Sequence, residues 1–202
     1  MLLLREALYA FQFGVSSDLN VQGDYTGDGK ADAAVWRHST GEWFVLRSED
    51  SSYYSVPFGT SGDIPAPGDY DGDGKFDLAV FRPSNGTWYV QRSTAGTLIT
   101  PFGSSGDKVT PADYDGDGKT DIAVWRPSNG RWYRSNSSDG QYVEIPLGAN
   151  GDVPSPADYD GDGKADIAVF RPSTGIWYSQ QSINGTSFGL NGDVPTPSTY
   201  VR

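Results

Sequence analysis

A nine-residue acidic segment that recurs four times constrains this chain more than any other feature. Three copies read DYDGDGKFD, DYDGDGKTD and DYDGDGKAD over residues 69–77, 113–121 and 158–166, and the first reads DYTGDGKAD over 24–32. Their shared pattern is Asp-x-Asp-x-Asp-Gly-x-x-Asp. Carboxylates at alternate positions of a tight loop converge on one point, and a hard cation with oxygen ligands relieves their mutual repulsion. The spacing therefore predicts a calcium-binding loop in every copy.

The EF-hand loop indicates which positions would bind the ion. That loop supplies oxygens from positions 1, 3, 5 and 9 and from the backbone carbonyl of position 7, with Gly at position 6. Position 7 is Lys in every copy, so we expect its carbonyl to face the ion and its side chain to face solvent. The four loops together predict about four calcium ions. Because Thr26 supplies a neutral oxygen at position 3, the first loop is expected to bind its ion most weakly. The predicted ligands are Asp24, Thr26, Asp28, Lys30 and Asp32; Asp69, Asp71, Asp73, Lys75 and Asp77; Asp113, Asp115, Asp117, Lys119 and Asp121; Asp158, Asp160, Asp162, Lys164 and Asp166.

The residues after each loop differ from an EF-hand. Position 12, where a bidentate Glu closes the EF-hand site, is Val in the runs AAVW, LAVF, IAVW and IAVF. These runs are short, β-branched and bounded by turn residues, which predicts strands in place of an exiting helix. The alternative is an Asp-Gly-rich turn without metal, and four repetitions of the ligand spacing argue against it.

The loops mark a repeat of about 45 residues. An Asp precedes each loop by six residues, and the series continues into the C-terminal segment, as Asp18, Asp63, Asp107, Asp152 and Asp193. Turn pairs such as Asn85-Gly86 divide each period into four short strands. Four strands per period of this length predict an all-β fold, a β-propeller with four-stranded blades. We expect a single propeller domain over residues 1–202, with repeats at 18–62, 63–106, 107–151 and 152–192.

The two ends of the chain suggest how the ring closes. Residues 1–17 contain a candidate hairpin, Leu2–Leu4 with Leu8–Phe13, and residues 193–202 contain a candidate strand, Val194–Tyr200. Together they would complete a fifth blade, so a five-bladed ring is favoured, since closure removes exposed strand edges. The alternative is an open segment of a larger propeller of six to eight blades, completed by further sequence or by self-association with a second chain.

The repeats also resemble a known family. The similarity rests on the acidic loop after a strand, the following LAV or IAV run and the recurrent Phe-Gly pair, as in Phe58-Gly59 and Phe102-Gly103. In these features the repeats are similar to the FG-GAP and VCBS-type repeats of integrin α-chain propellers and bacterial surface proteins. The resemblance extends from about Phe13 to Tyr200. It implies calcium in the loop between the first and second strands of each blade, on one rim of the propeller, and an association with adhesion.

Composition excludes several classes of partner and chemistry. The net charge is −11 and no Lys/Arg run exists to neutralise phosphates, so no nucleic acid partner is expected. The chain has no Cys and one His, which excludes disulfides and makes zinc chemistry improbable. No apolar run reaches the roughly 20 residues of a membrane span, and the opening MLLLREALYAF is too short in its apolar part for a secretion signal. Calcium loops of low affinity nonetheless suit the extracellular space or the cell surface.

No catalytic constellation is evident, and we expect no enzyme. The Asp that precedes each loop by six residues is interpreted as a turn residue, the other acidic residues outside the loops do not recur together, and His38 is isolated. In every repeat an aromatic residue is followed by an Arg, namely Arg37, Arg82, Arg126 and Arg171. If these pairs were exposed, they could stack on sugars. Their presence in every repeat instead favours packing between blades.

The sequence leaves three functional hypotheses open. The first is a non-catalytic, extracellular calcium-binding propeller that acts as an adhesion or carbohydrate-binding module, with a carbohydrate or a cell-surface or matrix protein as partner. The second is a structural spacer in a larger surface protein. The third is an accessory domain of a polysaccharide-degrading enzyme.

Overall fold

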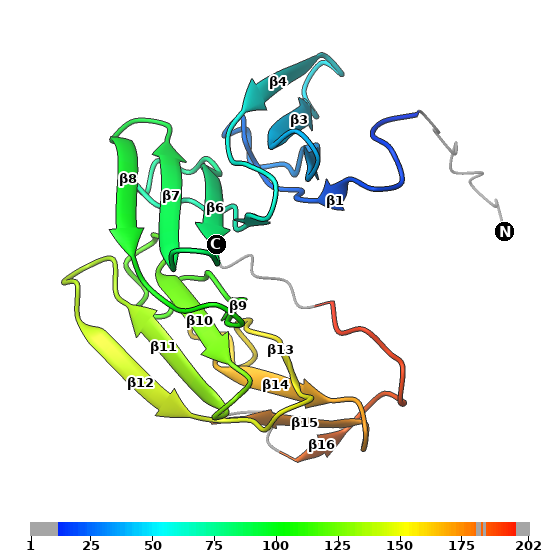
Figure 1. The fold of residues 1–202 in the computed structure, drawn as a ribbon, viewed down its shortest axis with the longest axis vertical. Helices are drawn as coiled ribbons and strands as arrows, with labels where there is room; N and C mark the ends of the chain where they lie inside the picture. Colours follow the sequence, from blue (N-terminus) through cyan, green and yellow to red (C-terminus); the bar gives the residue numbers. More distant parts are fainter. Residues whose placement is uncertain (1–11, 181–182, 184, 197–202) are drawn as a thin grey trace, which may run out of the picture.

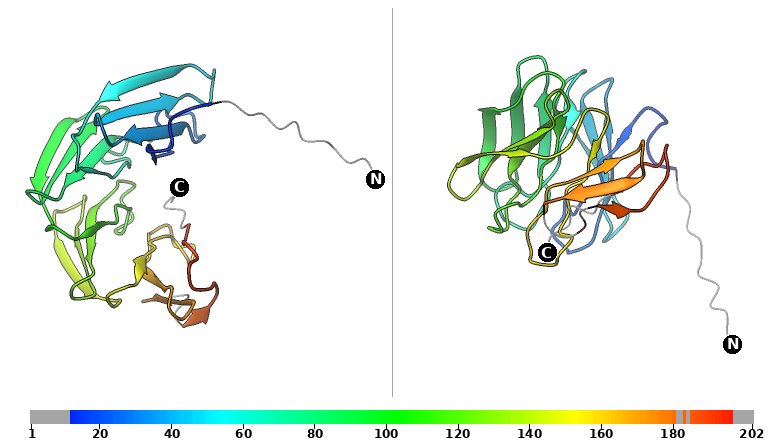
Figure 2. Two further views of the ribbon diagram at one scale, coloured as in Figure 1. Left: turned by 45° about the vertical axis from the view of Figure 1, so that its right-hand side comes forward. Right: turned by 90° about the horizontal axis from the view of Figure 1, so that it is seen from below.

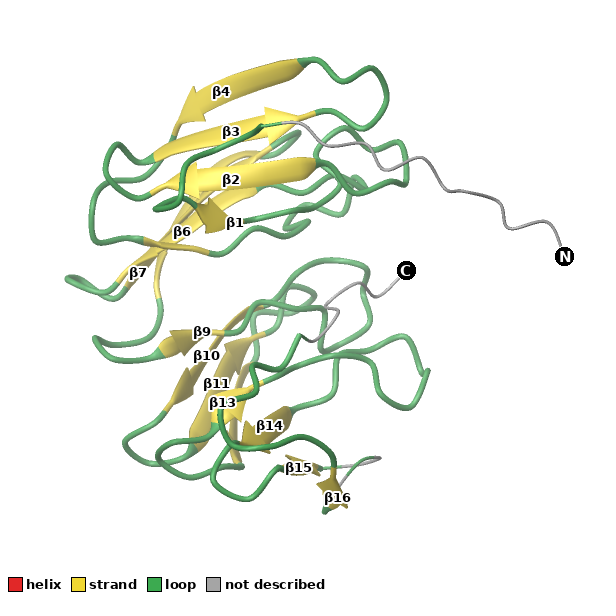
Figure 3. Ribbon diagram, turned by 90° about the vertical axis from the view of Figure 1, so that its right-hand side faces the viewer, coloured by secondary structure: helices red, strands yellow, loops and turns green. Residues whose placement is uncertain are grey.

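The computed structural model describes residues 12–180, 183 and 185–196, and in this part of the chain it contains sixteen strands and no helix (Figures 1 and 3). The first two blades consist of β1 (Leu19–Asn20), β2 (Ala33–Arg37), β3 (Glu42–Leu46) and β4 (Tyr53–Pro57), then β5 (Ile64–Pro65), β6 (Leu78–Arg82), β7 (Thr87–Arg92) and β8 (Gly96–Pro101). The third and fourth consist of β9 (Lys108–Val109), β10 (Ile122–Arg126), β11 (Arg131–Ser135) and β12 (Tyr142–Pro146), then β13 (Val153–Pro154), β14 (Ala168–Arg171), β15 (Ile176–Ser179) and β16 (Thr186–Ser187).

The strands of each blade pair in chain order as a four-stranded antiparallel sheet. The blades follow one another along an arc (Figure 2, left), so residues 12–196, as far as they are described, form a four-bladed propeller fold. This confirms the predicted all-β blades and corrects the prediction of five. A fifth blade needs pairing between strands from both termini, but Val194–Thr196 are not in a strand, and no ladder joins them to residues 12–18. Residues 1–11 and 197–202, which hold the rest of the expected fifth blade, lie outside the described residues.

The hydrophobic core lies in the contacts between consecutive blades, which we call seams 1–2, 2–3 and 3–4. In seam 1–2, Trp36, Trp43 and Val45 of the first blade pack with Leu78 and Val80 of the second. The other two seams are built in the same way. Burying one large apolar side chain contributes roughly 1.5–3 kcal/mol, so each seam stabilises both blades that form it.

Backbone contacts between the acidic loops join the blades at the inner edge of each seam. The N–H of Phe76 donates to the carbonyl of Asp24 in the preceding loop at 2.6 Å, and equivalent bonds join the second blade to the third and the third to the fourth. A Cβ on Gly23 would lie 2.1 Å from the Phe76 ring. Glycine is therefore required at Gly23 under Phe76, whereas the equivalent position of the third blade, where the next loop brings the smaller Ala165, is Ala112.

The Asp that opens each repeat has a structural role. Asp63 is buried and accepts two hydrogen bonds from Arg82, at 2.8 and 2.9 Å, while that guanidinium lies 4.4 Å from the centre of the Tyr89 ring. Every blade repeats this arrangement, through Arg37 with Asp18, Arg126 with Asp107 and Arg171 with Asp152. Each of these contacts lies within one repeat, so the recurrent Arg residues stabilise their own blade, whereas their repetition favoured packing between blades. In the described part of the chain, no helix is long and apolar enough to cross a membrane.

Candidate metal centres

Each acidic loop joins the inner strand of its blade to the next strand, as the resemblance implied. The loop over residues 69–77 follows β5 and precedes β6, and a bridge between Gly68 and Asp77 closes its base. Residues from all four loops, among them Asp24, Asp69 and Asp113, line one cavity of about 770 Å³. The loops therefore gather on the inner side of the arc.

Three carboxylates converge in each of the last three loops, from positions 1, 3 and 9. In the second blade these are Asp69, Asp71 and Asp77, and one oxygen from each lies within 4.8 Å of the others. The equivalent triads are Asp113, Asp115 and Asp121, and Asp158, Asp160 and Asp166. Among the described residues, clusters of three or more potential His, Cys, Asp or Glu ligands occur only in these loops. In the first loop Thr26 takes the place of the middle carboxylate.

Hydrogen bonds to positions 1 and 9 determine the shape of the loop. Asp69 accepts bonds from the N–H groups of Gly72 and Gly74, at 2.6 and 2.8 Å, which turns the chain around its carboxylate. Asp77 accepts from the N–H groups of Tyr70 and Ser93, both at 2.8 Å. Burial raises the pKa of Asp77 to about 6, and the nearby Asp71 and Asp69 add to the shift. Negative charge is therefore unfavourable at Asp77 unless a cation offsets it.

The oxygen at position 3 of the first two loops indicates whether the residues fit a metal ion. Thr26 Oγ1 in the first loop and Asp71 Oδ1 in the second are buried and make no hydrogen bond. A buried oxygen without a partner costs roughly 1–3 kcal/mol. Coordination by a hard cation would satisfy both atoms, and the all-oxygen donor set suits calcium. The loops therefore fit a calcium ion.

The other predicted ligands are placed differently from the triad. Asp73, at position 5, accepts from the N–H of Lys75 at 2.9 Å and from the Ser93 hydroxyl, and it does not belong to the cluster. Its equivalents Asp28, Asp117 and Asp162 accept from the Lys N–H in the same way. The carbonyl of position 7 stays a predicted ligand.

The lysine side chains depart in part from the expectation of solvent exposure. Lys30 and Lys164 are exposed, but Lys75 and Lys119 are half-buried. A Cβ on Gly27 would lie 3.0 Å from Lys75 Cγ and Cε, so the apolar stem of this lysine covers the preceding loop. This packing adds to the contact between consecutive blades.

Sequence reasoning missed the residues that attach each loop to the outer hairpin of its own blade. The N–H groups of Ser48, Ser93 and Ser137 donate to the position 9 carboxylates of their loops, at 2.6–2.8 Å. The hydroxyl and N–H of Thr94 also donate to Asp71, at 2.7 and 2.9 Å. A signal was present, because a Ser follows the last Asp of every loop by 16 residues.

Comparisons with known proteins agree with this architecture. A family model described as FG-GAP-like repeat matches residues 24–80, 69–124 and 113–169. No curated protein matches the chain.

Solved structures share the fold at low sequence identity. An Agrocybe aegerita lectin that recognises non-reducing terminal N-acetylglucosamine is 17% identical, with a TM-score of 0.59 over 84% of this chain and 50% of the lectin. BBS1N in complex with ARL6DN, soaked with mercury, is 13% identical, with a TM-score of 0.51 over 85% of this chain and 53% of that one. The chain thus spans about half the length of the solved chains it matches. On the family match, which extends over most of its length, the chain belongs to the FG-GAP-like repeat family.

Proposed function

We propose that the chain is a non-catalytic, calcium-binding propeller module that acts outside the cell or at its surface, in adhesion or carbohydrate binding. The observation that carries the calcium part is the pair of buried position 3 oxygens without partners, Thr26 Oγ1 and Asp71 Oδ1, beside the converging carboxylates. Positions 1, 3 and 9 would hold the ion, with further oxygens from positions 5 and 7.

Calcium acts in this proposal as a structural clip. Each loop contacts its own outer hairpin and the following blade, so an ion that orders the loop stabilises both. The ion would offset the repulsion among the three carboxylates and supply no reaction chemistry. Equal melting temperatures in calcium and in chelator, measured by calorimetry, would contradict this role.

The carbohydrate part is supported by the fold shared with a lectin that recognises N-acetylglucosamine. It is also consistent with the association of related repeats with surface proteins. A glycan array probed with the calcium-loaded chain tests it. We expect a defined set of bound glycans, lost when calcium is removed; uniform blanks across plant, bacterial and animal glycans would contradict it.

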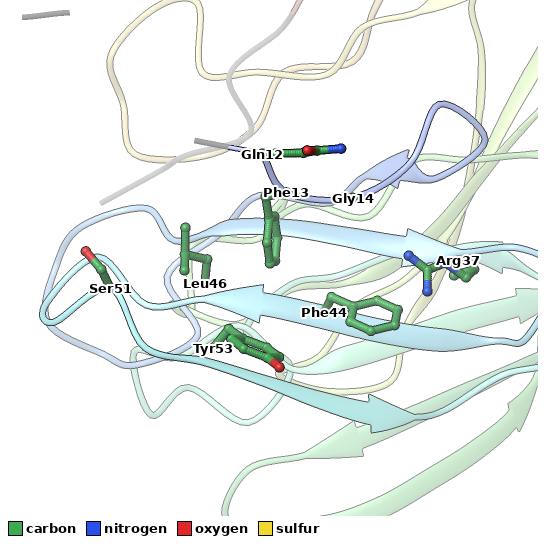
Figure 4. A pocket seen from close by; sticks show the side chains of 8 residues that line it. All are labelled: Gln12, Phe13, Gly14, Arg37, Phe44, Leu46, Ser51 and Tyr53. Atoms are coloured by element: carbon green, nitrogen blue, oxygen red, sulfur yellow. The ribbon is translucent and has the colours of Figure 1, made fainter. Parts of the chain in front are cut away.

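A second candidate, a spacer segment of a larger propeller, is favoured by the end faces of the arc. Phe44 and Leu46 of β3 point away from seam 1–2, and with Phe13 and Tyr53 they line an open pocket of about 560 Å³ (Figure 4). At the other end, Phe188 and Leu190 are each 75% exposed. The molecular mass in solution tests this candidate: a stable monomer argues against it, and specific association with adjoining repeats supports it.

A further inference from the structure

The three seams use equivalent positions, but seam 2–3 has smaller side chains than seam 1–2 at several of them, and two of these replacements are also polar. In seam 1–2, Phe76 packs on Tyr25 with ring centres 6.0 Å apart, and Val56 packs against the same core. In seam 2–3 Thr120 corresponds to Phe76, because each precedes the last Asp of its loop. Thr100 corresponds to Val56, because each pairs with a buried Trp of the neighbouring strand. Two apolar groups of seam 1–2 are thus replaced by hydroxyl-bearing ones.

Seam 3–4 is filled in another way. Arg134 lies 5.5 Å from the centre of the Tyr114 ring and donates to the Tyr114 carbonyl at 3.2 Å. Its equivalent in seam 2–3 is Val90, which is too short to reach that far. A cavity of about 270 Å³ therefore remains in seam 2–3, slightly below the roughly 300–1,000 Å³ typical of ligand pockets.

The chemistry of this cavity contrasts with the rest of the molecule. The chain carries a net charge of −11, and acidic residues line the cavity between the loops, yet the cavity in seam 2–3 has Arg92 and Lys119 and no carboxylate in its lining; Lys119 and Thr120 lie between the two cavities and line both. Its lining comprises Tyr70, Arg92, Leu98, Thr100, Lys119, Thr120, Ile122, Ser135, Asn136 and Ser137.

Two polar groups in this lining are available for a ligand. Asn136 Oδ1 is buried and makes no hydrogen bond. Lys119 forms no ion pair with any described residue, whereas Arg92 already donates to the carbonyls of Gly96 and Ala95. The cavity thus offers a positive charge and an unsatisfied acceptor beside apolar walls.

We propose that seam 2–3 binds a carboxylated monosaccharide, a hexuronate. Lys119 would pair with the carboxylate, since an ammonium binds a carboxylate by a charge-assisted hydrogen bond. Asn136 Oδ1 and the hydroxyls of Thr100 and Thr120 would bond the sugar hydroxyls, and Tyr70 would contact an apolar face of the ring. This inference rests on the carbohydrate part of the proposed function and assigns it a site and a substrate class.

The test compares methyl glucuronide with methyl glucoside by titration calorimetry on the calcium-loaded chain. We expect the glucuronide to bind at least tenfold more tightly. Lys119→Ala should reduce the affinity for methyl glucuronide at least tenfold, and it keeps the backbone carbonyl of the loop. The matched control Lys75→Ala, at the equivalent position of seam 1–2, should leave it unchanged.

Filling the cavity provides a second, independent test. Thr120→Phe gives seam 2–3 the same residue that Phe76 provides in seam 1–2. The larger ring should fit, because Gly68 lies under Thr120 as Gly23 lies under Phe76. It should abolish glucuronide binding and leave the calcium content unchanged. If this variant melts well below the parent, Thr100→Val, which copies Val56, takes its place; it removes one proposed sugar-binding hydroxyl without filling the cavity, and it should weaken glucuronide binding severalfold.

Three results would overturn the inference: no glucuronide binding to the folded chain, equal affinity for the two sugars, or undiminished binding when the cavity is filled. The proposed function has separate readouts on the same samples, namely calcium stabilisation and glycan-array binding. Array binding without glucuronide binding removes the hexuronate site alone, and the loss of both readouts removes the proposed function as well.

Discussion

The acidic loops of the first and second blades have almost the same internal contacts and, among the predicted ligand positions, differ at one side chain. Tyr25 and Tyr70 donate their N–H groups to the last Asp of the loop at 2.9 and 2.8 Å, and Ser48 and Ser93 donate to the same carboxylate at 2.8 Å. Position 3 is a neutral hydroxyl in one loop and a carboxylate in the other. The shape of the loop therefore comes from positions 1 and 9.

Position 3 has a different role. Asp71 accepts bonds from Thr94 and Ala95 of the outer hairpin through one oxygen, and its other oxygen has no partner. Thr26 Oγ1 has no partner either. This oxygen is not needed for the turn, so its charge is free to set the affinity for a cation.

Removing calcium should have the largest effect, because it acts on every loop. Each site contributes about 2.7 kcal/mol when free calcium is 100 times the dissociation constant, and the loops act together. We expect chelator to lower the melting temperature by roughly 15–30 °C. Calorimetry measures this, and re-addition of calcium should restore the original value. An unchanged melting temperature would mean that none of the loops needs the ion.

Alanine at position 3 should separate the two loops. Asp71→Ala removes a charged oxygen and its bonds to Thr94, so we expect the loss of one bound ion and a lower melting temperature. Thr26→Ala removes a neutral oxygen that has no hydrogen bond, so its effect on stability should be small. Calcium content by mass spectrometry and thermal melting measure both. Equal losses from the two variants would contradict a special role of charge at this position.

The reverse substitution should make the loops alike. Thr26→Asp gives the first loop the ligand set of the second, and we expect the calcium affinity of that loop to rise about tenfold. In chelator the same variant should be slightly less stable, because a third carboxylate then lacks a counter-charge. Titration calorimetry resolves the change, and Thr26→Asn serves as the uncharged control. A rise of the same size with Asn would assign the effect to geometry.

The smallest effect is expected at position 5. Asp73 accepts from the N–H of Lys75 and the hydroxyl of Ser93 and does not join the carboxylate triad, so Asp73→Asn should reduce affinity less than Asp71→Asn. Both substitutions remove one charge and keep the side-chain size. Titration of the two variants in parallel measures the difference, and a larger loss at Asp73 would show that its carboxylate turns toward the ion when calcium binds.

The parts of the fold that were predictable are those determined by local chemistry. The four blades follow from β-branched runs and from Asn-Gly or Thr-Gly turns, and the position of the loops follows from the spacing of Asp residues. The convergence of Asp69, Asp71 and Asp77 has the same local origin, because all three belong to one turn of the chain.

The features that could not be predicted depend on contacts between distant segments. The contact of the Lys75 stem with Gly27 and the attachment of Asp77 to Ser93 require knowledge of how blades and hairpins pack. The blade number has the same dependence, since closure needs pairing between the two ends of the chain. The gap in seam 2–3 likewise results from side chains on two different blades.

Native mass spectrometry along a calcium titration tests the central claim most directly, since it counts the ions bound to each folded chain. We predict a stepwise increase to four ions, in which the three loops with carboxylate triads bind first and the first loop binds at higher calcium concentration. In Thr26→Asp the fourth step should merge with the others. A chain that stays free of calcium at millimolar concentration, or a fourth step unaffected by the charge at Thr26, would contradict the account.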